Sequence, residues 1–244
     1  MPTHESVLDG GSESAARLSA TFAGMDPRTV MRAAIQKLYK GRIALVSSFG
    51  ADSAVLLHMV AEIDKSVPVI FIDTLVLFPE TLAYRDELVS RLGLTNVETV
   101  WPNPDLLERE DPENFLWATN PDRCCEIRKV LPLAEALDGY DAWISGRKRF
   151  QSTSRSNLAL VESEGGRIKI NPLAHWTARS ILSYLEAHAL PRHPLVAKNY
   201  PSIGCIPCTT PVKPGEDDRA GRWRGRGKVE CGLHTMPLYA GADI

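Results

Sequence analysis

Five cysteines are the residues whose spacing points most directly to chemistry in this chain of 244 residues. They occur as the adjacent pair Cys124-Cys125, as Cys205-x-x-Cys208, and as Cys231 alone. In a reducing compartment, grouped cysteines are more often metal ligands or reactive thiols than disulfides. The spacing therefore predicts four ligands and one separate thiol.

Four thiolates can hold either a tetrahedral zinc ion or an iron–sulfur cluster. Neighbouring Cα atoms lie about 3.8 Å apart and their side chains diverge on a helix, so a single zinc ion shared by Cys124 and Cys125 would be strained. A cubane cluster is larger and offers separate iron corners. This favours a cluster, with structural zinc or buried free thiols as alternatives.

The fifth cysteine, Cys231, follows a segment that is rich in arginine and glycine and contains no acid. A thiol among cations is shifted toward the nucleophilic thiolate, and guanidinium groups suit oxyanions such as phosphate or sulfate. A solvated basic segment is the alternative interpretation. The cations are Arg219, Arg222, Arg224, Arg226 and Lys228.

A second group of candidate residues occupies the loop Ser47–Ser53, between an apolar strand (43–46) and a helix (53–63). Backbone N–H groups at a helix N-terminus bind anions, and Ser48 and Ser53 add hydroxyl donors. The loop lacks the Walker A spacing. A basic turn, 146–152, follows another strand; there we expect Arg149 to contact the anion, because Lys148 lacks a bidentate fork.

Strands that alternate with helices surround these loops. This order predicts an α/β fold: a doubly wound, mainly parallel sheet with helices on both faces and a loop-rich C-terminal segment. In such sheets the ligand crevice lies at the carboxyl ends of the strands. The predicted strands are 43–46, 67–72, 96–101 and 142–145, and the predicted helices begin at Asp26-Pro27 and cover 53–63, 80–92 and 177–187.

Composition narrows the class of protein. Hydrophobic residues make up 44% and charged residues 24%, which excludes a disordered or fibrous chain. A net charge of −2 argues against nucleic acid as a partner, and no apolar run is long enough for a membrane helix. We expect a cytoplasmic protein with an N-terminal extension (1–25), a nucleotide-binding domain (26–204) and a segment that carries the second cysteine pair and the nucleophile (205–244).

Several motifs resemble one known family. The loop 47–53, followed by Asp73-Thr74, resembles the PP-loop (adenine nucleotide alpha-hydrolase-like) superfamily, with Phe49 in place of a usual glycine, as in its sulfonucleotide reductase branch. The segments Cys124–Lys129 and Tyr200–Cys208, together with Glu230-Cys231-Gly232-Leu233-His234, resemble assimilatory adenosine 5′-phosphosulfate (APS) reductases.

This resemblance implies an activity and a set of site residues. APS would be reduced to sulfite and AMP through an S-sulfo intermediate on Cys231, with thioredoxin or glutaredoxin as the reductant and a homo-oligomer allowed. One [4Fe-4S] cluster would be held by Cys124, Cys125, Cys205 and Cys208. Lys129 would lie near the cluster and the substrate, and His234 would orient or protonate groups at the nucleophile. The implied substrate-binding residues are Ser47, Ser48, Phe49, Gly50, Ser53, Asp73, Thr74, Arg149, Arg219 and Arg222.

Three other functions stay open. An enzyme that accepts the 3′-phosphorylated substrate PAPS, alone or besides APS, would need one more basic contact. A PP-loop enzyme that inserts sulfur into nucleic acid would need ATP, and the ending Glu-Cys-Gly-Leu-His argues against it. A non-enzymatic iron–sulfur or zinc redox sensor would have no reason to place a basic nucleophile motif beside an anion loop.

Overall fold

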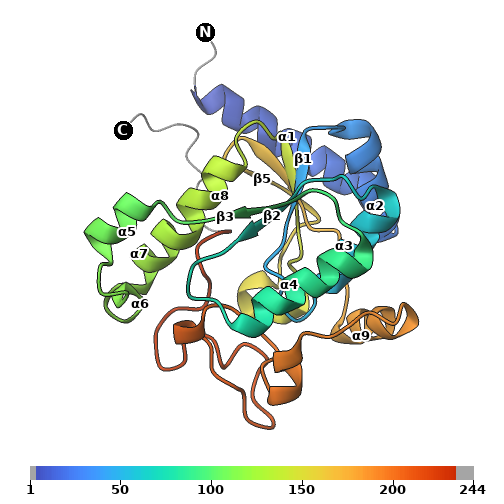
Figure 1. Cartoon of the computed structure of the whole chain (residues 1–244). Coiled ribbons are helices and arrows are strands. Elements are labelled where there is room, and N and C mark those ends of the chain that lie inside the picture. Colours follow the sequence, from blue (N-terminus) through green and yellow to red (C-terminus); the bar gives the residue numbers. More distant parts are fainter. Residues whose placement is uncertain (1–3, 235–244) are drawn as a thin grey trace.

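A computed structural model of the chain describes residues 4–234, so residues 1–3 and 235–244 of the first and third predicted segments lie outside it. Its centre is a six-stranded sheet in the order β3-β2-β1-β4-β6-β5. All neighbouring strands are parallel except β5, which runs antiparallel to β6. The predicted fold class is therefore confirmed (Figure 1). The strands are β1 (Ile43–Val46), β2 (Val69–Ile72), β3 (Val97–Val100), β4 (Ala142–Ser145), β5 (Val161–Glu164) and β6 (Arg167–Ile170).

Side chains that alternate along the strands form a separate core on each face of the sheet. On one face, residues such as Leu45 and Phe71 pack against helices α2, α3, α4 and α9; on the other, Ala44, Ile70 and Trp143 pack against α8 (Figure 1). Both faces are covered, as parallel sheets require. These helices are α2 (Pro27–Ala33), α3 (Ser53–Ile63), α4 (Pro79–Leu92), α8 (Leu131–Ala136) and α9 (Ala178–Ala187).

The helices start where their capping residues predict. The carboxylate of Asp26 accepts from the backbone N–H of Arg28, and Pro27 takes the first helical position of α2. Helix α3 has the predicted bounds, and α9 begins after Thr177, whose hydroxyl accepts from the N–H of Ser180. Sequence patterns therefore located α2, α3, α4 and α9, but not α8, which covers the other face of the sheet.

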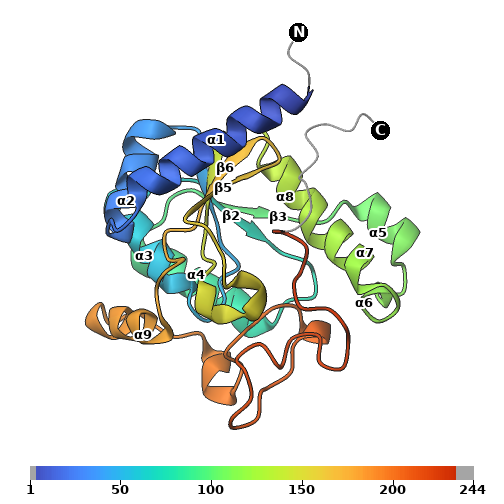
Figure 2. The same ribbon diagram turned by 180° about the vertical axis from the view of Figure 1, so that it is seen from behind.

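Several parts of the fold were not predicted, among them α1, the strands β5 and β6, and the helices between residues 104 and 136. Helix α1 (His4–Phe22) crosses the sheet at β5, where Ala15 and Phe22 enter the core (Figure 2). Strands β5 and β6 form a hairpin across Gly165 and Gly166, both of which adopt positive φ. Charged residues interrupt the apolar pattern of these strands, but the Gly-Gly pair is itself a hairpin signal.

Residues 104–130 form an array of short helices that carries the first cysteine pair. Helix α7 (Pro121–Cys125) continues through a π-helical turn, η2 (Glu126–Val130), directly into α8. A π-helical turn shifts the side chains that follow it to a new angle around the axis. The other short elements are α5 (Pro104–Glu110), α6 (Leu116–Thr119), a π-helical turn η1 (Ala34–Leu38), and the 3₁₀ turns η3 (Arg149–Gln151), η4 (Thr153–Arg155), η5 (Pro194–Lys198) and η6 (Ile206–Cys208).

The chain after α9 wraps around one end of the sheet in mostly irregular structure (Figures 1 and 2). It is attached to the loop after β2, because the N–H of Ile206 donates to the carbonyl of Val76 at 2.8 Å and Leu77 forms a bridge with Cys205. The second cysteine pair is thereby held at the carboxyl end of β2. Within residues 4–234, no helix combines the length and the apolar character needed to cross a membrane.

Candidate active site

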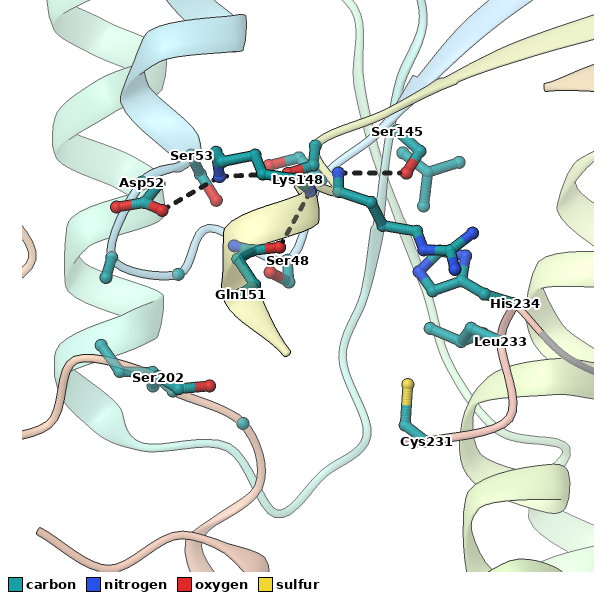
Figure 3. A pocket seen from close by; sticks show the side chains of 18 of the residues that line it. Ser48, Asp52, Ser53, Ser145, Lys148, Gln151, Ser202, Cys231, Leu233 and His234 are labelled. Atoms are coloured by element: carbon teal, nitrogen blue, oxygen red, sulfur yellow. Dashed lines mark hydrogen bonds and ion pairs between the residues drawn. The ribbon is translucent and has the colours of Figure 1, made fainter. Parts of the chain in front are cut away.

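A cavity of about 250 Å³ lies at the carboxyl ends of β1 and β4, where the fold class places its ligands. Several parts of the sequence meet there, among them the loop after β1, the turn after β4, and the C-terminal segment. Figure 3 shows the sulfur of Cys231 pointing into this space, with Lys148 and Asp52 on another side of it.

The loop between β1 and α3 forms one wall. Ser47, Ser48, Gly50 and Ser53 line the cavity, so the N-terminus of α3 faces it, as predicted for an anion site. Phe49 does not line it. Its ring is fully buried and packs edge-on against Phe71, with the ring centroids 5.3 Å apart, so only its backbone belongs to the loop.

The turn after β4 supplies two cations, but not the one expected from the sequence. Arg147 and Lys148 line the cavity, whereas Arg149 lies outside it and donates through Nε to the carbonyl of Leu158 at 2.8 Å. The ammonium of Lys148 is bonded to Asp52 at 2.9 Å. Burial lowers the pKa of Lys148, and Asp52 opposes this effect. The chain turns so that position 148 points inward and 149 outward.

Only two of the five cations before Cys231 reach the cavity, Arg219 and Arg222. The other three are held outside it. Glu216 pairs with Arg224, the ring of Trp117 lies under Arg226, and Asp122 pairs with Lys228.

Arg222 lies in a tight position at the cavity. Its guanidinium stacks over the ring of Trp223, 4.4 Å from the centroid, and donates to the carbonyl of Ile203 at 3.4 Å. Its Nε is buried and forms no hydrogen bond to any described residue, and in residues 4–234 Arg222 forms no ion pair. Arg222 is thus a cation available to an anion in the cavity.

Glu230, the residue before Cys231, is bound by two arginines of the cavity wall. Arg155 donates Nε to Oε1 and Nη2 to Oε2, both at 2.7 Å, and Arg219 donates to Oε2 at 3.2 Å. Sequence reasoning did not single out Arg155. The feature of the sequence that could have identified Arg155 is Gln151, four residues earlier. The side-chain oxygen of Gln151 accepts a hydrogen bond from Arg155 at 2.6 Å.

Cys231 is half-buried, and its surroundings favour the thiolate. Burial by itself raises the pKa of this thiol. The ammonium of Lys129, the backbone N–H of Leu233 and the guanidinium of Arg222 act the other way and bring the pKa below the ordinary thiol value. A thiolate inside an anion-binding cavity can attack an electrophilic group carried by the anion.

His234 stacks on Trp143, with ring centroids 5.7 Å apart and the planes 10° from parallel. Burial, and then the charges of Lys169 and Arg147, lower its pKa well below the ordinary value, so the imidazole is neutral near pH 7. This geometry supports an orienting role for His234 at the cavity wall.

Lys129 and Trp223 lie between this cavity and a smaller space that contains the other four cysteines. The π-helical turn η2 begins just after Cys125, and Lys129 is its fourth residue. Burial opposes its charge, but the Coulombic interaction with the sulfurs of Cys205, Cys231 and Cys125 outweighs burial and raises the pKa of Lys129, so the ammonium persists. One cation thus faces both the single thiol and the grouped thiols.

All four grouped cysteines are buried and line the smaller space together. Burial raises the pKa of Cys124 to about 12 and that of Cys125 to about 11, so these thiols stay protonated unless a metal displaces the protons. Within residues 4–234, no three or more Cys, His, Asp or Glu side chains are arranged around one metal ion. A cluster with separate iron corners does not need sulfurs that converge on one point, so the donor set fits it.

Thr74 and Arg128 attach the two cysteine pairs to the sheet. The hydroxyl of Thr74 lies 3.3 Å from the sulfur of Cys205, while its carbonyl accepts from Arg128 at 2.9 Å. Arg128 forms a buried ion pair of 2.7 Å with Asp111. Asp73, predicted beside the adenosine, lies outside the cavity wall and accepts from the N–H of Leu75.

The doubly wound sheet, the anion loop after β1 and the thiol at the strand ends define an α/β protein of the PP-loop type. The profile of the phosphoadenosine phosphosulfate reductase domain matches residues 42–211. The chain therefore belongs to the phosphoadenosine phosphosulfate reductase family, and the family resemblance predicted from the sequence is confirmed.

Individual relatives agree with this assignment. The chain is 52% identical over 230 residues to an adenosine 5′-phosphosulfate reductase of Mesorhizobium japonicum, covering 94% of this chain and 91% of the relative. It is 51% identical over 227 residues to one from a Chelativorans species, with 93% of both chains covered. The crystal structure of a PAPS reductase from Candida auris in complex with phosphate matches 86% of this chain and 98% of its own, with a TM-score of 0.68 and 27% identity.

Proposed function

We propose that this reductase converts APS to sulfite and AMP, using Cys231 as the nucleophile. The observation that carries the proposal is that the Cys231 sulfur lies on the wall of the same cavity as the anion loop and the arginines. The names of the relatives that are about half identical to the chain support APS as the substrate. The four grouped cysteines beside the cavity agree with the type of reductase that the sequence resembles.

The reaction has two steps. The phosphosulfate binds between the N-terminus of α3 and Arg222, with Lys148 and Arg147 nearby. The Cys231 thiolate attacks sulfur, the sulfur–oxygen bond to the phosphate breaks, and AMP leaves with the electron pair. Cys231 keeps the sulfonate as S-sulfocysteine. Nearby cations stabilise the charge that develops on the leaving phosphate oxygen.

A dithiol protein, thioredoxin or glutaredoxin, completes the cycle. Its thiolate attacks the Cys231 sulfur and releases sulfite, leaving a mixed disulfide. Its second thiol then restores the Cys231 thiol, so the partner is oxidised and sulfite carries away the electron pair. We assign this chemistry to the cytoplasm, where thiols remain reduced.

Cys124, Cys125, Cys205 and Cys208 would hold one [4Fe-4S] cluster. When bound, the cluster would supply negative charge and rigidity next to Lys129. Lys129 and Trp223, which line both the cavity and the smaller space, would link the position of the cluster to Cys231. Replacing any one of the four cysteines should therefore remove iron and activity together. Residues 26–204 would form the nucleotide-binding domain, and 205–244 would carry the nucleophile.

The test is the intact mass of anaerobically purified protein after incubation with APS, and separately with PAPS, in the absence of any thiol reductant. One sulfonate group per chain, mapped to Cys231 and formed faster with APS, is expected; Cys231→Ser should give none. The Cys231→Ser variant also controls for adducts on the other cysteines. Equal rates with both nucleotides would retain the mechanism and remove the preference for APS. Absence of an adduct with either would refute the proposed function.

A further inference from the structure

The guanidinium of Arg147 lines the cavity with two of its three nitrogens unused. Its Nη1 donates to Oε2 of Glu162 at 3.2 Å. The Nε is buried without a hydrogen-bond partner, and Nη2 forms no hydrogen bond to any residue of 4–234. The exposed fraction of this side chain is only 12%, so water does little to satisfy these groups. Arg147 therefore has two N–H groups available to an anion in the cavity.

The counter-charge of Arg147 lies outside the cavity. Glu162 belongs to the edge strand β5, and β6 separates this strand from β4, whose following turn carries Arg147. Glu162 does not line the cavity. In the ion pair of Lys148 with Asp52, by contrast, both partners line it. Glu162 can thus hold Arg147 without occupying the space of a ligand.

A single oxygen of Glu162 fixes Arg147 to the sheet. Besides Arg147, the Oε2 of Glu162 accepts from Nδ2 of Asn171 at 2.7 Å, and it lies 3.8 Å from the ammonium of Lys169. Burial lowers the pKa of Lys169, and the charge of Arg147 acts in the same direction, so the two cations repel each other. The carboxylate that both cations approach offsets this repulsion. Its loss would leave Arg147 without the contact that holds it in place.

Arg147 lies on the side of the cavity that holds the nucleophile. Figure 3 shows Cys231 and His234 on one side and the start of α3, with Ser53, on another. Burial, and then nearby positive charges that include Arg147, lower the pKa of His234. Burial lowers the pKa of Arg147 itself, and the carboxylate of Glu230 is one of the groups that oppose this effect. Arg147 is therefore close to residues on both sides of Cys231 in the sequence.

We propose that Arg147 binds the sulfonate end of APS and that Glu162 is the positioning residue that holds Arg147 there. The Nε and Nη2 of a guanidinium form a fork that fits two oxygens of an oxyanion. Here this fork is free, while Nη1 stays on Glu162. This inference rests on the proposed function, because it takes APS as the ligand.

The contact has a use in both steps of the reaction. During attack, the positive charge of Arg147 reduces the repulsion between the Cys231 thiolate and the sulfonate oxygens. After transfer, the same charge stabilises the sulfonate on Cys231 while AMP departs. Both Arg147 and Glu162 are anchored to the sheet, so their arrangement stays in place throughout the cycle.

The first experiment compares APS with AMP, which lacks the sulfonate. Both nucleotides are titrated calorimetrically into anaerobically purified protein that carries Cys231→Ser, so that APS is not consumed. In this background, Arg147→Ala should weaken APS binding by roughly tenfold, the order expected for lost hydrogen bonds to a charged group, and leave AMP binding unchanged. Equal losses for both nucleotides would assign Arg147 to the phosphate and overturn the proposal, as would unchanged APS binding.

The second experiment removes the charge but not the shape of Glu162, with Glu162→Gln in the same background. We expect APS to bind several-fold more weakly and AMP to bind as before. When residue 147 is already alanine, Glu162→Gln should cause no further loss, because it acts through Arg147. Additive losses would refute the positioning role. Near-UV circular dichroism checks that the variant is folded, and the Arg147→Ala measurement does not depend on it.

Glu164→Gln is the matched control. Glu164 lies on the same strand and also pairs with Lys169, but it forms no hydrogen bond with Arg147 and does not line the cavity. Its loss should leave the ratio of APS to AMP affinity unchanged. Failure of the proposed function would appear separately, as absence of an APS adduct on Cys231 of the unmodified protein. If only this inference is wrong, the adduct still forms and Arg147→Ala leaves the ratio unchanged.

Discussion

At the scale of single residues, the position of Arg222 depends on the absence of a side chain at Gly204. A Cβ atom built on Gly204 would lie 2.3 Å from Nη2 of Arg222 and 2.6 Å from its Cζ. The guanidinium cannot move toward Trp223 to avoid it, because the two are already stacked. Any side chain at position 204 therefore displaces the cation that the proposed reaction needs.

Gly204→Ala should reduce the rate of Cys231 sulfonation by APS by at least tenfold, while the protein stays folded. The expected cause is a displaced Arg222, because its positive charge then no longer stabilises the phosphosulfate or the Cys231 thiolate. Single-turnover mass spectrometry measures the rate. Gly227→Ala is the control, because a Cβ there meets no atom within 4 Å. Equal losses in both variants would contradict this explanation.

Residue types and motifs predicted the thiols and the C-terminal arginines of the site, but not the direction of every side chain. Arg219 and Arg222 reach the cavity as expected, whereas Lys148 replaces Arg149 there. Which residue of the turn after β4 faces inward depends on Asp52, which bonds Lys148 from another segment. That contact is tertiary, so no pattern within residues 146–152 contains it.

At the scale of secondary structure, the helix that carries Cys124 and Cys125 is held by Arg128 in the π-helical turn. Arg128 bonds the carbonyl of Thr74, the amide oxygen of Asn114 and the carboxylate of Asp111. Its contacts join the cysteine helix to the loop after β2, and the segment that carries the second cysteine pair is attached to the same loop. Since each pair belongs to a different part of the chain, this buried cation determines how they meet.

Asp111→Asn should lower the free energy of unfolding by about 3–5 kcal/mol, which is the cost of leaving one partner of a buried ion pair, here Arg128, without its counter-charge. The amide keeps the oxygen that accepts from the N–H groups of Phe115 and Leu116, so only the pairing with Arg128 is lost. Urea unfolding measures the loss, and iron per chain should fall with it. Asp141→Asn, which weakens an exposed pair with Arg42, should change neither. An intact iron content in Asp111→Asn would show that Arg128 does not organise the cysteines.

Most elements with a regular apolar face were predicted, with the short helix α8 as an exception, and elements stabilised by polar contacts were not. Lys169 on β6 is fully buried, over the ring of Trp143, and is paired with Glu164 on β5. These charges hide the strand pattern in the sequence, because each is acceptable only with its partner in place. Helix α1 was missed because, among its residues 11–22, only Ala15 and Phe22 are buried.

At the scale of the whole molecule, His193 joins α4 to the segment that leads to the active site. Its Nδ1 accepts from the N–H of Leu195, which places the proton on Nε2, and this donates to the hydroxyl of Thr81 at 3.0 Å. The ring is buried against Tyr84. Burial lowers the pKa of His193 to about 4, although the nearby charge of Glu80 opposes this effect.

The fold should therefore lose stability in acid through His193. The unfolded chain binds a proton near pH 6.5, but the folded one does so only near pH 4. The contribution is complete above pH 6.5 and is lost as pH falls to about 4. His193→Asn keeps an acceptor for Leu195 and cannot titrate. Its free energy of unfolding, from urea titrations at pH 7.5 and 5, should change less between these pH values than that of the unmodified protein. Equal changes would assign the acid sensitivity to other groups.

Phe49 has a consequence for how the anion loop meets its ligand. The residue adopts a φ of 46°, a conformation that glycine enters freely and other residues rarely, and its buried ring holds the backbone there. A glycine loop would have to become ordered when the ligand arrives, at an entropic cost to affinity. Here the ordering is completed during folding. The loop is preorganised by the hydrophobic core, so a change in core packing behind Phe71 would alter ligand affinity without touching a single ligand contact.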